Sequence, residues 1–148
     1  MNVTKKWLQE HDACAEGMRW CKKNDLFDST PRKFIEALIE GDHVGWASWL
    51  IARLLDHDGQ IKYAIFAAEQ VLHIFEKKYP DDKRPRKAIE AAKHYLETHS
   101  AADRKAADAA ADAAAYAAYA ADAARDKMKI SIVIHGLSLL EASDLCPA

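Results

Sequence analysis

The side chains best suited to recognising a partner lie in an alanine-rich segment, where sixteen of residues 101–124 are alanine. From position 108 onward, the larger side chains follow one another at spacings of 4, 4, 3, 3 and 4 residues. At about 100° per residue, a helix places all of them in one stripe roughly 120° wide. The members of this acidic-aromatic stripe are Asp108, Asp112, Tyr116, Tyr119, Asp122 and Asp126.

Carboxylates and tyrosines on one helical face form a surface that suits a protein partner. Acidic groups complement a basic cleft and speed association with it, and tyrosine is a recurring interface anchor with a rigid ring and a polar tip. We therefore predict that the partner contacts Asp108, Asp112, Tyr116, Tyr119 and Asp122. In the alternative interpretation, the stripe is the solvated edge of a central helix whose tyrosines pack on neighbouring helices.

A second group of charged side chains surrounds Pro80 and Pro85 and is basic. Such a patch could bind phosphate, and four of its members are the candidate anion site of an alternative function. Two aspartates in the same loop and a formal net charge of −2 instead favour a solvated loop. Because cations oppose the dipole at a helix start, at least one arginine should pair with a carboxylate or carbonyl of another element. The four candidates are Lys83, Arg84, Arg86 and Lys87.

Motifs for catalysis or metal binding do not stand out in this sequence. Seven histidines are present, but no two are three or four residues apart and none forms an HExxH motif. There is also no GxSxG nucleophile motif and no phosphate-binding glycine loop. Three cysteines at unpaired spacings, Cys14, Cys21 and Cys146, do not form a disulfide framework. We therefore predict a protein that is not an enzyme, with no catalytic residues, metal or cofactor.

The elements that position these groups follow from helical periodicity bounded by caps and stops. Thr30 and Pro31 begin one helix, Asp42 caps the next, and Asp58–Gly59 is expected to end it. Pro80 ends the fourth segment and Ser100 caps the alanine-rich one. The last segment could also be a strand because it is rich in β-branched residues, but it has no strand partner. The first predicted helical segment covers residues 4–24 and has a break near Asp12. The others cover residues 31–41, 42–58, 60–79, 85–96, 101–124 and 129–141, and residues 142–148 are expected to be frayed.

These segments predict one all-α domain over residues 1–148, a bundle of six or seven helices around the alanine-rich helix. The chain has 148 residues, of which 50% are hydrophobic, which suffices for a core without disulfides or metals. The start of the chain lacks an apolar signal-peptide stretch, and no apolar run is long enough to span a membrane, so we expect a cytoplasmic protein. The predicted core includes Trp46, Trp49, Leu50, Ile65, Phe66 and Phe75.

Three stretches of the chain resemble a known family. They are WLQEHDACAEGMRWCKK at 7–23, WASWLIARLL at 46–55, and RPRKAIEAAKHYL at 84–96 followed by the alanine-rich helix. Together they resemble the Imm5-like immunity proteins of bacterial polymorphic toxin systems. The most specific element is residues 84–92 followed by the alanines, and the segment after Lys129 is the least typical.

The resemblance implies an all-α protein that neutralises a cognate toxin in the cytoplasm by binding and covering it. It carries over no catalytic residues. Two alternatives remain: a phage or bacterial inhibitor of a host defence enzyme, and a helical module that binds nucleic acid or anions through residues 77–87. The negative net charge disfavours nucleic acid, and the sequence does not determine the oligomeric state.

Overall fold

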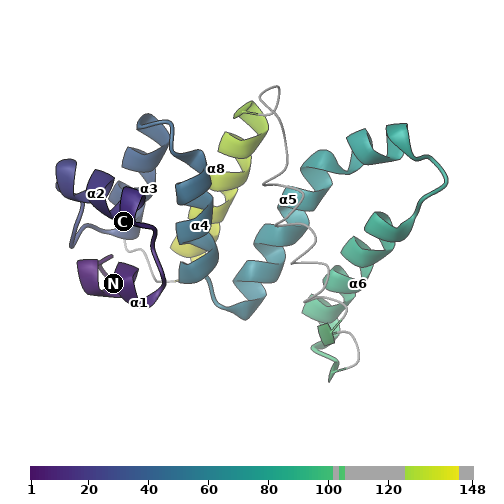
Figure 1. Ribbon diagram of the computed structural model, residues 1–148. Coiled ribbons are helices and arrows are strands. Elements are labelled where there is room, and N and C mark those ends of the chain that lie inside the picture. The colour runs from purple at the N-terminus through teal and green to yellow at the C-terminus, as the bar shows by residue number, and fades with distance from the viewer. Residues whose placement is uncertain (102–103, 106–125, 144–148) are drawn as a thin grey trace.

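The computed structural model describes residues 1–101, 104–105 and 126–143, and every extended regular element in this part of the chain is a helix (Figure 1). The predicted all-α fold class is confirmed. The only β-type pairing in the same residues is an isolated bridge between Val3 and Ser29. The helices are α1 (Lys5–Glu10), α2 (Ala15–Lys23), α3 (Pro31–Glu40), α4 (Val44–Leu54), α5 (His57–Lys78), α6 (Arg84–Thr98) and α8 (Asp126–Ala142).

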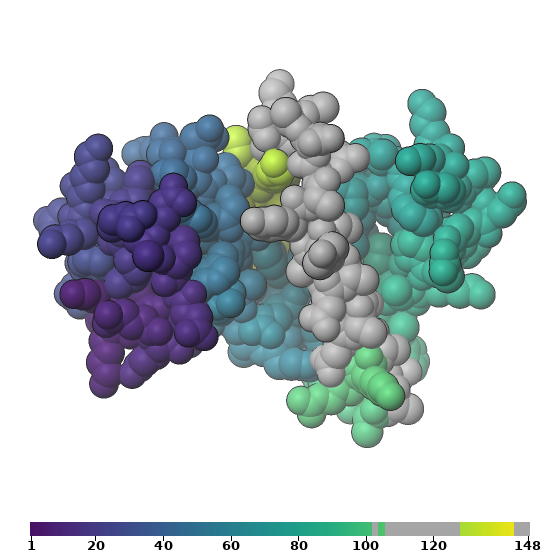
Figure 2. All heavy atoms as spheres, viewed as in Figure 1, coloured from purple at the N-terminus to yellow at the C-terminus, as the bar shows by residue number. Residues whose placement is uncertain are grey.

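The helices are arranged in two connected parts. Helices α1, α2 and α3 gather on one side, and α4 and α8 lie side by side in the middle (Figure 1). Helix α5 runs outward from the end of α4, and α6 returns antiparallel along it, so that these two helices protrude as an arm (Figures 1 and 2). Helix α5 is therefore shared, because it packs against α8 as well as against α6.

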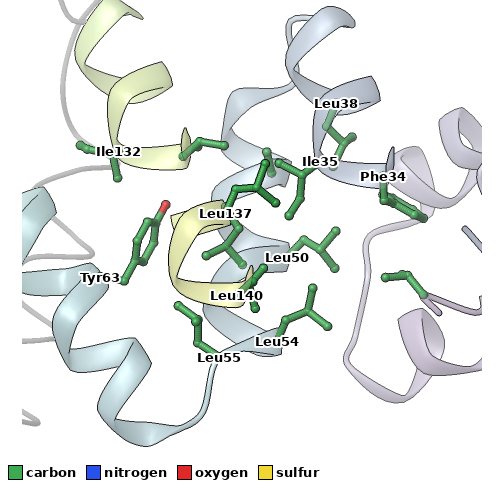
Figure 3. Packing of buried hydrophobic residues seen from close by; sticks show 14 of the residues in the cluster. Phe34, Ile35, Leu38, Leu50, Leu54, Leu55, Tyr63, Ile132, Leu137 and Leu140 are labelled. Atoms are coloured by element: carbon green, nitrogen blue, oxygen red, sulfur yellow. The ribbon is translucent and has the colours of Figure 1, made fainter. Parts of the chain in front are cut away.

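The main hydrophobic core lies where α3, α4, α5 and α8 converge. Figure 3 shows Leu137 and Leu140 of α8 among side chains from α3 and α4, with Tyr63 of α5 beside them. Leu140 is completely buried and Leu50 is 1% exposed. Burying one such side chain contributes about 1.5–3 kcal/mol. The helix predicted for residues 129–141 is thus confirmed, and its apolar residues belong to the core rather than to a strand.

Helix α8 lies close against its neighbours at Gly136, where a side chain would not fit. A Cβ atom on this residue would lie 2.6 Å from Cγ2 of Ile51 and 2.7 Å from Cε2 of Tyr63. The Tyr63 hydroxyl is hydrogen-bonded to the Ser48 hydroxyl at 2.8 Å, which joins α5 to α4 beside this contact. Arg32 of α3 forms an ion pair with Glu141 at the other end of α8. Three helices are therefore bound to α8.

The arm has a small hydrophobic cluster of its own between α5 and α6. Its buried members are Ile61, Ala92 and Tyr95, with Ile65 and Leu96 packed against them. Three buried side chains cover little apolar surface, so charged contacts between the same two helices supplement them.

Helices α1, α2 and α3 end in the same way, with an aspartate in the left-handed conformation. The φ angles of Asp12, Asp25 and Asp42 are 58°, 52° and 61°. After each aspartate, the next amide donates to the carbonyl five residues back, as in His43 to Leu38 at 2.8 Å. This is the Schellman motif, in which glycine is the usual left-handed residue. The break predicted near Asp12 is confirmed.

Two predicted helix boundaries were wrong. Asp42 ends α3 instead of capping α4, whose N-cap is His43 without a side-chain hydrogen bond. The residues Asp58 and Gly59 do not end α4 either, because both lie in the first turn of α5. Asp56 caps that helix, and its carboxylate accepts from the Gly59 amide at 2.8 Å. A glycine that follows a polar residue often marks the end of a helix, but it fits equally well in the first turn of the next helix.

The predicted cap of α3 and the predicted end of α5 are confirmed, whereas the Ser100 cap with Asp103 stays a prediction because Asp103 lies outside the described residues. The Thr30 hydroxyl accepts from an amide in the first turn of α3, and Pro31 stands at the start of that helix. Helix α5 ends at Lys78, with Tyr79 as the residue before Pro80. Arg104 donates its amide to the Ser100 carbonyl at 3.1 Å. Most of the predicted alanine-rich helix and the tail at 144–148 lie outside the described residues.

The six residues predicted to be largely buried are covered to different degrees. Leu50 is buried, whereas the others are half-buried. Helical spacing does not separate the centre of a buried face from its edge, and the flanking positions carry large rings that are only partly covered. The half-buried residues are Trp46, Trp49 and Phe66 at the main core, Ile65 at the arm cluster, and Phe75 farther along α5.

We predict that Gly136→Ala destabilises the protein by about 1–3 kcal/mol, because the new methyl group overlaps α4 and α5. Gly45→Ala in α4 is the matched control, since a Cβ there meets nothing within 4 Å. This second change should be neutral or stabilise by up to about 1 kcal/mol through helix propensity. Urea unfolding monitored by circular dichroism measures both. Equal effects of the two substitutions would contradict the close-approach explanation.

Candidate functional site

The acidic-aromatic stripe, which was the first predicted binding surface, falls outside the residues that the structure describes. Asp108, Asp112, Tyr116, Tyr119 and Asp122 all lie between positions 106 and 125. The last stripe residue, Asp126, is the first residue of α8. The stripe therefore remains a prediction from the sequence.

The arginines of the predicted anion site are both engaged by carboxylates. The Arg84 guanidinium donates to Asp82, with Nε 2.9 Å from Oδ1 and Nη2 2.5 Å from Oδ2. This hydrogen bonding lowers the pKa of Asp82 to about 2. The Arg86 guanidinium donates through two nitrogens to the two carboxylate oxygens of Glu76, both at 2.8 Å. The prediction that at least one arginine pairs with another element is confirmed by Arg86, which joins α6 to α5.

The two lysines of the predicted anion site, Lys83 and Lys87, are exposed, and neither forms an ion pair with another described residue. The positive charge available to a phosphate is thus smaller than the sequence indicated, because half of the four cations are already neutralised. The structure gives Arg84 and Arg86 a role in shaping the tip of the arm. This geometry favours the solvated-loop interpretation over the anion-binding alternative.

Two ion pairs and one histidine–aspartate hydrogen bond run along the arm between its antiparallel helices. Besides Glu76 with Arg86, the Lys93 ammonium is 2.6 Å from the Glu69 carboxylate. At the other end, Nε2 of His99 is 2.9 Å from Oδ2 of Asp58. The hydrogen bond from His99 lowers the pKa of Asp58. Because exposed pairs contribute little stability individually, their main effect is to set the register of α6 on α5.

A pocket of about 430 Å³ lies where α1, α2, α3 and α4 meet. Its floor is made of side chains that belong to the hydrophobic core: Leu8, Cys21, Phe34, Leu38 and Leu50. Its volume lies within the range of small-molecule and side-chain binding pockets.

Aromatic rings and carboxylates surround the opening of this pocket. The half-buried rings of Trp46 and Trp49 line it together with His43, which stacks on Trp46 with 4.0 Å between ring centroids. The three carboxylates that line it, all exposed, come from three separate places in the fold. They are Asp12 after α1, Glu16 in the first turn of α2, and Asp42 after α3.

The two cysteines in the described part of the chain differ in reactivity. Cys21 is buried in the pocket floor, and burial raises the pKa of its thiol to about 11, which keeps it protonated and unreactive. Cys14 is exposed at the pocket, and its Sγ accepts from the Gly17 amide at 3.3 Å. No group of three or more His, Cys, Asp or Glu side chains capable of holding a metal occurs among the described residues.

The comparison with known families shows which family the chain belongs to. The family model described as "Imm-5 like putative immunity protein" matches residues 52–133, more than half of the sequence. The chain belongs to this family. The match contains the stretch at 84–96, whereas the stretch at 7–23 lies outside it. No curated protein and no solved structure matches the chain.

The Imm-5 like match and the pocket occupy different parts of the molecule. The match begins in the last turn of α4 and includes the arm and the first half of α8, whereas all pocket residues lie between Leu8 and Leu50. Within the described helices, none is long and apolar enough to cross a membrane. The arm therefore lies wholly within the family match.

Sequence reasoning missed the pocket because its residues come from four helices. Trp46 and Trp49 were assigned to the core, as tryptophans three residues apart on one helical face usually are. Their half-buried state could not be read from spacing. One signal was present, because acidic residues follow α1 and α3 where glycine is the usual stop.

We predict that Glu76→Gln removes part of the acid sensitivity of folding. The hydrogen bond from Arg86 lowers the pKa of Glu76 in the folded state. This pair therefore stabilises the protein above the ordinary glutamate pKa of about 4.3, and the stabilisation is lost as the pH falls through the lower folded-state value. Unfolding measured from neutral to strongly acidic pH should show the variant less stable at neutral pH, with the difference shrinking in acid.

The matched control for this measurement is Glu97→Gln, which changes an exposed glutamate on α6 that forms no ion pair with another described residue. The difference in stability between this control and the parent protein should not shrink as the pH falls. A Glu76→Gln difference that stays constant at all pH values would contradict the role assigned to the pair.

Proposed function

We propose that this Imm-5 like protein binds a cognate bacterial toxin in the cytoplasm and inhibits it by covering the toxin's active site or substrate groove. The match to the immunity protein family over residues 52–133 carries this proposal. Occlusion needs no reactive group in the inhibitor, only a rigid surface with a few anchoring side chains. The packing of α8 against α3, α4 and α5 supports such rigidity.

The charge distribution supports a basic partner. Carboxylates line the pocket, and the sequence predicts further acids on the stripe, whereas both arginines at the tip of the arm are neutralised within the molecule. Toxins that act on nucleic acids have basic clefts, so an acidic inhibitor surface would compete with their substrate. The proposal therefore specifies a toxin with a positively charged substrate groove.

We expect co-expression of the chain with its cognate toxin to relieve the growth arrest that the toxin causes. The two proteins should elute together as a stoichiometric complex in size-exclusion chromatography, because occlusion requires one inhibitor for each toxin. A toxin inactivated by substitution in its own active site should still bind, which separates binding from catalysis. Growth arrest that persists at an excess of soluble inhibitor would refute the proposed function.

We further expect that replacing Asp108, Asp112 and Asp122 together by Asn slows association with the toxin, most visibly at low salt. Removing three negative charges weakens electrostatic steering, which salt screens. The control replaces Asp25, Asp28 and Asp81 together by Asn. It removes the same charge from exposed acids that are not part of the stripe. Stopped-flow association rates compare the two variants. If both retain the rate of the parent protein, the stripe is not part of the toxin-binding surface.

A further inference from the structure

The pocket between α1 and α4 combines features that select one kind of side chain. Its floor is apolar, so it accepts methylene groups and excludes a small hydrated ion. The floor residues are also members of the main core, which holds the shape of the pocket. An occupant that fills the pocket must therefore present an apolar stem to the floor.

The indole rings beside the floor are suited to a planar cation. Trp49 already has the Arg53 guanidinium over its ring, 4.1 Å from the centroid, at the edge of this region. Trp46 provides a second half-buried indole in the pocket lining. Cation–π interactions are strongest with tryptophan and occur most often with arginine. The aromatic part of the lining therefore favours a guanidinium over an aliphatic tip.

The charges at the opening point to the same occupant. Asp12 acts electrostatically on Arg53 and is partly compensated by it. Glu16 and Asp42 are exposed and form no ion pair with another described residue. Among the described residues, no lysine or arginine lines the pocket, and His43 is the only basic side chain in its lining. The opening therefore carries net negative charge and repels phosphate groups and acidic side chains.

We propose that this pocket receives an arginine side chain from the protein that the chain binds. An arginine stem packs on the floor, its weakly hydrated guanidinium stacks on indole rings, and its nitrogens donate to carboxylates. Lysine fits less well because its ammonium is strongly hydrated and does not stack. The inference rests on the proposed function for the identity of the partner, but its test does not need the toxin.

The test uses Nα-acetyl-arginine amide as a probe of the isolated full-length chain. Titration followed by NMR of the indole N–H groups should shift the signals of Trp46 and Trp49 saturably, with a dissociation constant in the millimolar range expected for one residue. Trp7 does not line the pocket and is an internal control. The matching citrulline amide, which has the same shape without the charge, should bind several-fold more weakly.

Two surface variants test the role of the carboxylates without disturbing the core. Combining Glu16→Gln with Asp42→Asn should weaken binding of the arginine probe at least several-fold. Asp25→Asn is the control, because Asp25 has the same left-handed conformation after α2 but lies away from the pocket. The proposal is overturned if the arginine probe shifts neither pocket indole, if citrulline binds equally well, or if the double variant binds like the parent protein.

Failure of this inference is distinguishable from failure of the proposed function. If the chain protects against the toxin but ignores the arginine probe, the inhibitor uses another surface. If the probe binds as described but no toxin is neutralised, the pocket serves a different arginine-bearing protein. If the chain neutralises the toxin and also binds the arginine probe, combining Glu16→Gln with Asp42→Asn should reduce toxin affinity at least several-fold. Asp25→Asn should leave that affinity unchanged.

Discussion

At Gly136, the backbone of α8 lies directly against the side chains of Ile51 in α4 and Tyr63 in α5. This approach lets Leu137 and Leu140 reach the centre of the main core, where they meet residues of α3 and α4 (Figure 3). A helix late in the sequence thereby joins three earlier ones. The placement of the arm and the pocket follows from this packing, because α4 borders the pocket and α5 begins the arm.

The two parts of the molecule are stabilised differently. The part around α8 depends on complete burial of large apolar side chains, which is the strongest contribution available to a domain of this size. The hydrophobic cluster between α5 and α6 has three buried members and is supplemented by exposed ion pairs, which contribute less stability and depend more on salt. We therefore expect α6 to exchange its amide hydrogens faster than α4 or α8.

In this Imm-5 like protein, the arm and the pocket are separate parts of the molecule. The arm lies within residues 52–133, where the chain matches its family, and its arginines are paired internally. The pocket is made of residues before the match and leaves Glu16 and Asp42 unpaired with other described residues. A surface outside the shared segment can differ between relatives without disturbing the arm.

The sequence alone determined the fold class and most helix boundaries, because periodicity, Thr30–Pro31 and Pro80 act within a few residues of the chain. It also indicated that Arg84 or Arg86 needs a partner, since helix dipoles are local. Tertiary structure decided the rest. Whether Gly59 stops or starts a helix, how far Trp46 is buried, and which acids surround a pocket all depend on distant contacts. Those contacts are set by how closely α8 can approach α4 and α5, which spacing along one helix does not encode.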